Sequence, residues 1–241
     1  MSMKSYRTNS SDGVGIHVLD TLDEADLSIS PLLICPGLSE TAEEFEALME
    51  FLLPRRCVAL SFRGRGHSDT PLTGYGLEEH VADIEKVVQT AGLIQYHMYS
   101  HSRGVSYALG YARAEKPHIR SLLLDDYPPE HRAMSEAWAE EYLHEYIIPH
   151  ERLPHIRQEA IIGIHRDSEY AALEIMLPQP VLVMHGMLDD SMITEEDLNR
   201  YKLMCADLTV RPFAHSGHGI RMTEEQGLYE TIRDFLNQCD K

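Results

Sequence analysis

The sequence is poor in cysteine, tryptophan and basic residues, and it contains no long hydrophobic run. Its 241 residues include 4 cysteines, 1 tryptophan and 21 lysines and arginines, against 39 aspartates and glutamates. The formal net charge of −18 repels phosphate backbones and anionic lipid surfaces. No apolar run approaches the ~20 residues that a membrane-spanning helix needs. We therefore expect neither a nucleic-acid partner nor a membrane partner.

The cysteines and histidines do not form a metal-binding pattern in the sequence. The cysteines are Cys35, Cys57, Cys205 and Cys239, and no two of them form a CxxC motif. His215 and His218 have HxxH spacing, but no cysteine or third histidine lies near them in sequence. Cysteines so spaced, in a chain that begins without the apolar core of a signal peptide, are expected to be free thiols. These patterns predict no metal, no other cofactor and a cytoplasmic location.

Short apolar segments alternate with amphipathic segments along the chain. The predicted strands cover 30–35, 56–62, 96–99, 121–125, 180–185 and 208–213, and the predicted helices include 42–51, 77–89 and 224–235. Continuous apolar strands that alternate with helices indicate a parallel sheet with helices on both faces, an α/β fold. Such sheets bind ligands at the carboxyl ends of their strands. We expect one domain over residues 1–241.

Residues 127–179 interrupt this alternation. Three segments within this range have helical patterns, at 133–146, 151–162 and 167–176. We expect a small helical cap over the edge of the sheet, and the alternative is one long crossover connection. Four aromatic residues of the range, Tyr127, Trp138, Tyr142 and Tyr146, are expected near this cap, where they either line a pocket or pack the cap onto the sheet.

The pentad Ser100-His101-Ser102-Arg103-Gly104 follows a predicted strand and precedes a helical pattern. A small-x-Ser-x-Gly pentad in this context is typical of a nucleophile elbow, a strained turn that projects the middle serine from the sheet edge. Small residues are needed at the first and last positions because the strand and helix backbones nearly touch there. Ser102 is therefore the candidate nucleophile.

A serine nucleophile needs a histidine to accept its proton and a carboxylate to orient that histidine. His218 lies between two glycines after the strand predicted at 208–213, and His215 is the alternative. Asp189 follows the strand predicted at 180–185, in the position expected for the carboxylate, and Asp190 is the alternative. The sequence thus predicts a catalytic set of Ser102, His218 and Asp189.

Two backbone N–H groups are needed to stabilise an oxyanion on the substrate. We expect them from Arg103, which follows the nucleophile, and from Leu38, because Pro36 has no N–H. The Arg103 side chain has two interpretations. It binds a substrate carboxylate, or it forms a buried ion pair with Asp125 or Asp126.

Four motifs together resemble those of the α/β-hydrolase fold superfamily. They are Arg63-Gly64-Arg65-Gly66-His67-Ser68, the Ser102 pentad, His185-Gly186-Met187-Leu188-Asp189 and Gly217-His218. Three departures from the family pattern are Pro36-Gly37 in place of His-Gly, Ser61 in place of Asp, and Ser100 in place of the first elbow glycine. The resemblance implies an eight-stranded, mostly parallel sheet, a lid and a Ser102–His218–Asp189 triad.

The resemblance also implies a function. It favours hydrolysis of a carboxylic ester of a small molecule through an acyl-enzyme, since a serine nucleophile excludes the chemistry of family members that use aspartate at this position. Two alternatives stay open. One is a carbon–carbon bond hydrolase or a cofactor-free relative on the same fold, and the other is a ligand sensor with low turnover.

Overall fold

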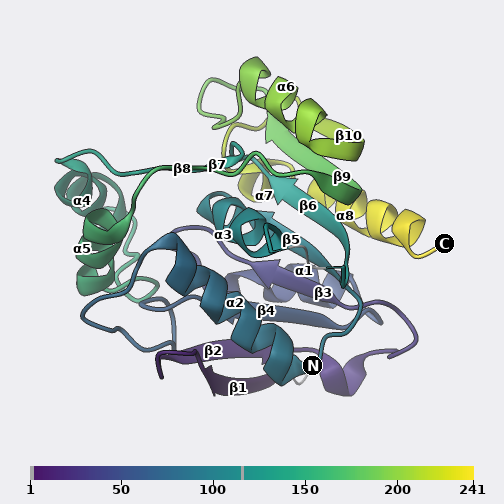
Figure 1. Cartoon of the computed structure of the whole chain (residues 1–241), viewed down its shortest axis with the longest axis horizontal. Helices are drawn as coiled ribbons and strands as arrows, with labels where there is room; N and C mark the ends of the chain where they lie inside the picture. Colours follow the sequence, from purple (N-terminus) through teal and green to yellow (C-terminus); the bar gives the residue numbers. More distant parts are fainter. Residues whose placement is uncertain (1–2, 115–116) are drawn as a thin grey trace.

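The computed structural model, which describes residues 3–114 and 117–241, is built around an eight-stranded sheet (Figure 1). The sheet order is β1-β2-β4-β3-β5-β6-β9-β10. The β1–β2 and β2–β4 pairs are antiparallel, and all the other pairs are parallel. The strands are β1 Lys4–Asn9, β2 Gly15–Asp20, β3 Leu32–Cys35, β4 Cys57–Ser61, β5 Tyr96–His101, β6 Ile119–Asp125, β9 Leu177–Gly186 and β10 Cys205–Phe213.

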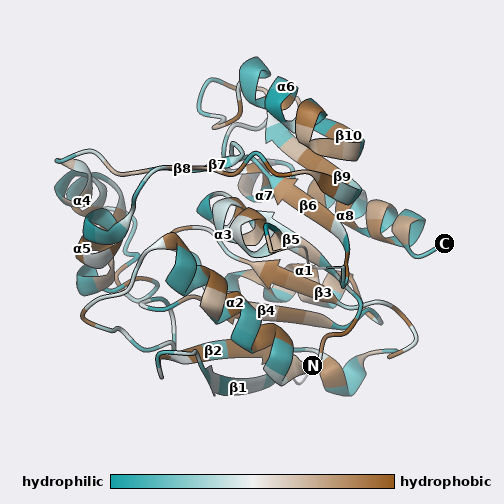
Figure 2. Ribbon diagram, viewed as in Figure 1, coloured by the Kyte–Doolittle hydropathy of each residue, from teal (hydrophilic) through white to brown (hydrophobic). Residues whose placement is uncertain are grey.

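Helices cover both faces of this sheet. They are the short η1 Leu22–Glu24 and η2 Ala42–Phe45, then α1 Glu46–Phe51, α2 Leu77–Ala91, α3 Arg103–Ala112, α6 Glu195–Met204, α7 Ile220–Thr223 and α8 Glu225–Cys239. One core cluster packs α2, α3 and α6 against the sheet, and a second packs η2, α1 and α8 against the opposite face. The strands between them are apolar, whereas the outward sides of the helices are polar (Figure 2).

Successive side chains of a strand belong alternately to the two cores. In β3, Leu33 and Cys35 belong to one core, while Leu32 and Ile34 belong to the other. This period of two is the geometry of a strand buried on both faces. The α/β class and the mostly parallel sheet are therefore as the sequence predicts.

The antiparallel hairpin of β1 and β2 was not among the strands predicted from the apolar pattern. Only one residue of β1, Thr8, is buried, so the strand has no apolar run to mark it. The hairpin turns at Gly13, which has a φ of 86°, and the N–H of Ser10 bonds the carbonyl of Val14.

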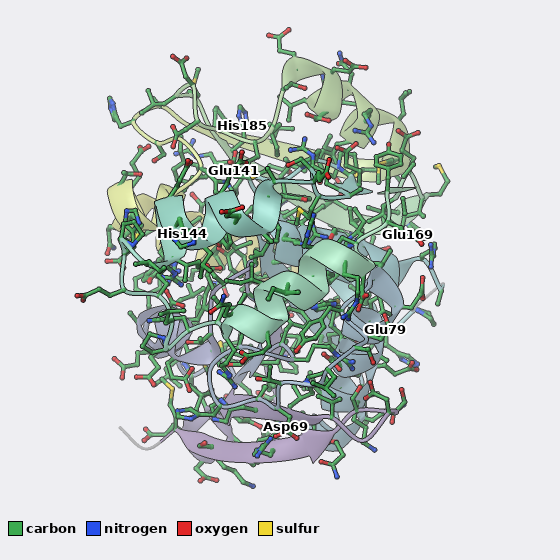
Figure 3. The ribbon with its side chains drawn as sticks, turned by 90° about the vertical axis from the view of Figure 1, so that its left-hand side faces the viewer. Asp69, Glu79, Glu141, His144, Glu169 and His185 are labelled. Carbon is green, nitrogen blue, oxygen red and sulfur yellow. The ribbon has the colours of Figure 1, made fainter. Side chains whose placement is uncertain are left out.

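Between β6 and β9 the chain leaves the sheet, and we call residues 127–176 the cap segment. It contains β7 Glu130–His131, α4 Trp138–Glu141, the π-helical η3 Tyr142–Ile147, α5 Gln158–Asp167 and β8 Ala171–Ala172. Figure 1 shows α4 and α5 beyond the carboxyl ends of the strands. Figure 3 views the molecule from that side, with Glu141 and His144 on the helical turns in front of the sheet. β9 begins at Leu177, inside the range 127–179 expected for the cap.

The prediction of a third cap helix at 167–176 is wrong. Residues 171–172 form the strand β8, which pairs with β7 in antiparallel fashion. The chain must return from α5 to β9 across the sheet edge, and an extended segment spans this distance with fewer residues than a helix.

No helix in the described ranges is both long and apolar enough to cross a membrane.

Candidate active site

Ser102 lies in a sharp turn between β5 and α3. Its backbone has φ 52° and ψ −134°, a region that residues with a side chain rarely adopt. The turn also requires Gly104, because a Cβ there would lie 2.4 Å from the carbonyl oxygens of both Cys35 and Pro36. The strained serine is the feature that the pentad predicted. The close approach at Gly104 is to Cys35 and Pro36, at the end of β3, and not to the strand that precedes the turn.

His218 lies in the loop between β10 and α7, and its imidazole reaches Ser102. The Nε2 atom of His218 is 2.9 Å from the Ser102 Oγ. The side chain of His218 is 30% exposed, whereas Ser102 is buried. The structure thus brings together the nucleophile and the histidine that the sequence singled out, at a distance that permits proton transfer between them.

The carboxylate at this histidine is Asp126, which follows β6. Its Oδ2 atom accepts hydrogen bonds from Nδ1 of His218 at 2.8 Å and from the N–H of Met192 at 2.9 Å. Its Oδ1 atom accepts bonds from the Ser191 hydroxyl at 2.6 Å and from the N–H of Gly186 at 3.2 Å. Burial alone would raise the pKa of Asp126, but the bonds from His218 and Ser191 lower it below its usual value. Asp126 is therefore held as an anion.

The expectation that Asp189 orients the histidine is wrong. Asp189 is exposed in the turn after β9, and it makes no hydrogen bond within the described residues. The alternative, Asp190, only accepts a 3.4 Å bond from the backbone N–H of His218. The loop after β9 instead supplies donors to Asp126, because it folds back over the end of β6. The alternative histidine, His215, is exposed and bonds Glu224 through its N–H.

The signal for Asp126 was present in the sequence. Asp125 and Asp126 end a run of leucines, so they follow a buried strand as directly as Asp189 does. The sequence predicts them only as possible partners of Arg103. The backbone of Asp126 has a φ of 48°, a second left-handed residue at the sheet edge beside Ser102. A strained residue that carries a buried charge is typical of a functional site.

The loop at residues 36–40 lies against the nucleophile. A Cβ on Gly37 would be 3.1 Å from the Ser102 Cβ. The N–H of Gly37 bonds the Glu40 carboxylate at 2.7 Å, so it is not available to a ligand. Leu38 follows, and its carbonyl accepts a 2.8 Å bond from Nε of Arg65. Arg103 begins α3, so its N–H has no acceptor within the helix.

His101, beside the nucleophile, belongs to a buried network of charges. Its Nδ1 is 2.8 Å from Glu40, whose other oxygen accepts a bond from Arg221. Burial alone would lower the pKa of His101, but the Glu40 carboxylate raises it to about 9. The imidazole rings of His101 and His218 stack, with 5.2 Å between their centroids. A protonated imidazole therefore packs against one face of the His218 ring.

A cavity of about 640 Å³ opens in front of Ser102 and His218. All four aromatic residues singled out in the cap line it. Trp138 and Tyr142 stack at 5.0 Å, and Tyr142 and Tyr146 stack at 5.3 Å. Trp138 belongs to α4 and the two tyrosines belong to η3. Because the three residues are spaced four apart on consecutive helical turns, their rings form one wall of the cavity. The cap thus contributes an aromatic wall to the cavity.

The side chain of Arg103 does not form the ion pair that was one of its two interpretations. Its Nη atoms donate to the Arg132 carbonyl, both at 3.1 Å, and Nη2 also donates to Ser168 at 2.7 Å. Its Nε donates to the Tyr107 hydroxyl at 3.2 Å. The remaining partner, His131, accepts at 3.1 Å, and its pKa is lowered to about 3 by burial and by the Arg103 charge. Arg103 thus bonds neutral acceptors inside the protein.

Within residues 3–114 and 117–241, no group of three or more histidine, cysteine, aspartate or glutamate residues could hold a metal ion. All four cysteines are free thiols.

Comparison with known proteins finds similarity to hydrolases. A model of the alpha/beta hydrolase fold matches residues 30–145. N-formylmaleamate deformylase from Pseudomonas putida is 25% identical over 240 residues, which cover 86% of this chain and 88% of that protein. A 2-(acetamidomethylene)succinate hydrolase from Mesorhizobium japonicum is 29% identical over 111 residues, 45% of this chain and 40% of its own length. The structure of an esterase from Exiguobacterium antarcticum superposes with a TM-score of 0.78 and 19% identity, over 97% of this chain and 100% of that one.

Proposed function

Because the chain belongs to the α/β-hydrolase fold superfamily, we propose that it is a serine hydrolase that cleaves a carboxylic acyl bond of a small molecule, with Ser102 as its nucleophile. The observation that carries this proposal is the chain of hydrogen bonds from Ser102 through His218 to Asp126, which opens onto a cavity of about 640 Å³. Ester hydrolysis is the reaction that we assign first.

The geometry supports the following mechanism. His218 accepts the Ser102 proton as the oxygen attacks the substrate carbonyl, and Asp126 stabilises the imidazolium that forms. The N–H groups of Leu38 and Arg103 stabilise the oxyanion of the tetrahedral intermediate. Collapse of this intermediate expels the alcohol, which takes its proton from His218. A water molecule, activated by His218 in the same way, then hydrolyses the acyl-enzyme and frees Ser102.

Hydrolysis of an amide is the second candidate. It is supported by the names of the two sequence relatives, one a deformylase of N-formylmaleamate and the other a hydrolase of 2-(acetamidomethylene)succinate. Both names describe an acyl group on nitrogen. The same nucleophile, base and oxyanion donors serve both reactions, but the leaving amine must receive a proton from His218 before it departs.

The test is covalent labelling together with turnover. We expect a fluorophosphonate to add one mass equivalent to the wild-type protein and none to Ser102→Ala. The wild type should hydrolyse simple aryl esters, and the variant should lose this activity by at least about 10³-fold. A folded wild type that neither reacts nor turns over an ester or an N-acyl substrate would contradict the proposal. It would favour the ligand sensor that the sequence left open.

A further inference from the structure

The charge of the cavity is opposite to that of the whole protein. The chain carries a formal net charge of −18. The cavity is nevertheless lined by four arginines, which are Arg103, Arg132, Arg152 and Arg221, and by only two carboxylates, which are Glu40 and Glu44. His101, which also lines it, adds a further positive charge because its pKa is about 9. A positive cavity in an acidic protein attracts an anionic ligand and orients it.

Two of these arginines are occupied by the lining carboxylates themselves. Arg152 donates to both oxygens of Glu44 at 3.0 Å and to the Ser39 carbonyl at 2.8 Å. Arg221 donates to Glu40 and to the Glu44 carbonyl, and its guanidinium lies 4.4 Å from the centroid of the Phe45 ring. Both side chains thus serve to hold the walls of the cavity. Arg103 is likewise occupied by acceptors within the protein.

Arg132 differs from the other three. Its Nε donates to Glu130 at 2.8 Å, but its two Nη groups have no acceptor among the described residues. Its side chain is 40% exposed, and its guanidinium lies 5.6 Å from the centroid of the Tyr127 ring, which also lines the cavity. Glu130 neutralises the charge of Arg132 only in part, because the same carboxylate also accepts a 2.9 Å bond from Arg200. The free edge of Arg132 therefore retains a pair of donors with bidentate geometry.

The position of Arg132 is fixed from the nucleophile elbow. Arg103, the residue after Ser102, bonds the Arg132 carbonyl through both Nη atoms at 3.1 Å. The same residue contributes its N–H to the proposed oxyanion site. Arg103 thus connects the backbone of Arg132 to the backbone of the nucleophile elbow.

We propose that Arg132 binds a carboxylate of the substrate, so that the preferred substrates are acyl compounds that carry a second, anionic group. This proposal rests on the proposed function, since it names the substrate class of the same site. The carboxylate accepts two hydrogen bonds from the Nη groups of Arg132, beside the Tyr127 ring, while the scissile carbonyl lies at Ser102. Arg103 acts as a positioning residue for this contact and does not itself bind the carboxylate.

The experiment compares acidic and neutral esters in pairs. The first pair is 4-acetoxybenzoate and its methyl ester, which differ in a carboxylate on the leaving group. The second pair is monoethyl glutarate and diethyl glutarate, which differ in a carboxylate on the acyl group. For each pair, kcat/KM is measured for the wild type, Arg132→Met and Arg132→Lys. The control is Arg233→Met, because Arg233 is a half-buried residue of α8 that pairs with its neighbour Asp234, lies over the Phe51 ring and does not line the cavity.

We expect the wild type to prefer the acidic member of at least one pair. In Arg132→Met the ratio of acidic to neutral kcat/KM should fall by about 10- to 100-fold, the range expected for hydrogen bonds between charged groups. Arg132→Lys should recover part of this ratio, since it keeps the charge but not the bidentate geometry. Arg233→Met should keep the ratio of the wild type. Equal ratios in the wild type and in Arg132→Met would overturn the proposal, while ester hydrolysis itself would stand.

Equilibrium binding separates this proposal from the proposed function. Glutarate, titrated calorimetrically into the wild type and Arg132→Met, should bind the variant at least about tenfold more weakly. Binding that depends on Arg132 in a protein with no turnover and no fluorophosphonate adduct would support the carboxylate site and contradict the hydrolase. Glutarate binding that is absent, or equal in both proteins, would overturn the carboxylate site whatever the esters show.

Discussion

Asp126 Oδ2 lies 2.8 Å from Nδ1 of His218, although the two residues are 92 positions apart in the sequence. Asp126 is wholly buried, and three further donors of the protein hold its carboxylate in place. This arrangement fixes which nitrogen of His218 carries a proton when the ring is neutral, and it leaves Nε2 free to accept the proton of Ser102.

The first prediction separates Asp126 from Asp189. Asp126→Asn should lower kcat on an aryl ester by about 10³- to 10⁴-fold, because the amide cannot stabilise the imidazolium and can favour the wrong tautomer. Asp189→Asn should change kcat by no more than about twofold, since that side chain is exposed and makes no hydrogen bond to His218. Steady-state kinetics on the two purified variants decides whether Asp126 or Asp189 is the acid. The reverse order of effects would restore Asp189 as the acid.

The sequence was sufficient for the residues whose local context is distinctive. The pentad around Ser102 requires a strand, a strained turn and a helix in succession, and the structure has all three. The carboxylate partner of His218 could not be identified in this way, because β6 and β9 are adjacent parallel strands whose carboxyl ends lie at the same edge of the sheet. A carboxylate after either strand can reach His218. Which of them does so depends on the fold of the loop after β9, and no local pattern encodes this.

The role of Arg103 shows the same limit. Its sequence position predicted a buried guanidinium beside the nucleophile, and the structure agrees. The acceptors, however, come from Tyr107, His131, Arg132 and Ser168, and the last three of these lie in the cap segment. Contacts of this kind depend on how the cap folds back on the sheet. The sequence predicted that segment least well, as the missing helix at 167–176 shows.

A second prediction concerns the ion pair of His101 and Glu40. The pKa of His101 rises from 6.5 to about 9 on folding, because the effect of Glu40 exceeds the opposing effect of burial. The pair therefore stabilises the fold fully below pH 6.5, and this contribution is lost as the pH rises through about 9. Loss of one partner of a buried pair costs about 3–5 kcal/mol, and each kcal/mol lowers Tm by about 2–4 °C in a domain of this size.

The pair is tested by thermal unfolding of the wild type and His101→Gln from pH 5 to pH 10. The difference in Tm should be largest between pH 5 and 6.5 and should shrink as the pH approaches 10. Glu40→Gln should give the same trend, because the pKa of Glu40 is itself held below 4.5 by His101 and Arg221 against the effect of burial. A difference in Tm that stays constant over this range would show that folding does not raise the pKa of His101, and it would contradict the ion pair.

A third prediction links the cap segment to the 36–40 loop. Arg152 bonds the Ser39 carbonyl at 2.8 Å, and the Tyr142 hydroxyl bonds the Ser39 side chain at 2.9 Å. These contacts hold the residue next to Leu38, whose N–H is proposed to stabilise the oxyanion. Arg152→Met should therefore lower kcat by about 10-fold or more, with a smaller change in KM, because this donor acts mainly in the transition state.

Inhibition separates this effect from a general loss of structure. A boronate that mimics the tetrahedral intermediate should bind Arg152→Met more weakly, in proportion to the fall in kcat/KM, while Ki for the product acid changes less. Arg113→Met is the control, since Arg113 forms an exposed pair with Glu78 on the surface. An equal loss of affinity for boronate and product would mean that Arg152 shapes the cavity without acting on the oxyanion donor.

The last prediction uses two glycines with opposite surroundings. Gly104→Ala should destabilise the protein by more than about 3 kcal/mol, because its Cβ would lie 2.4 Å from the carbonyl oxygens of Cys35 and Pro36, and neither backbone can move without displacing the nucleophile elbow. Gly227→Ala should instead stabilise it by about 0.5–1 kcal/mol, because Gly227 lies in α8 with its nearest neighbour 3.8 Å from the added methyl. Urea unfolding measures both changes. Because no residue of α8 lines the cavity at Ser102, Gly227→Ala should also keep the fluorophosphonate reactivity of the wild type, whereas any folded Gly104→Ala protein should lose it. A Gly104→Ala protein with normal stability and labelling would show that α3 does not need this close approach to expose Ser102.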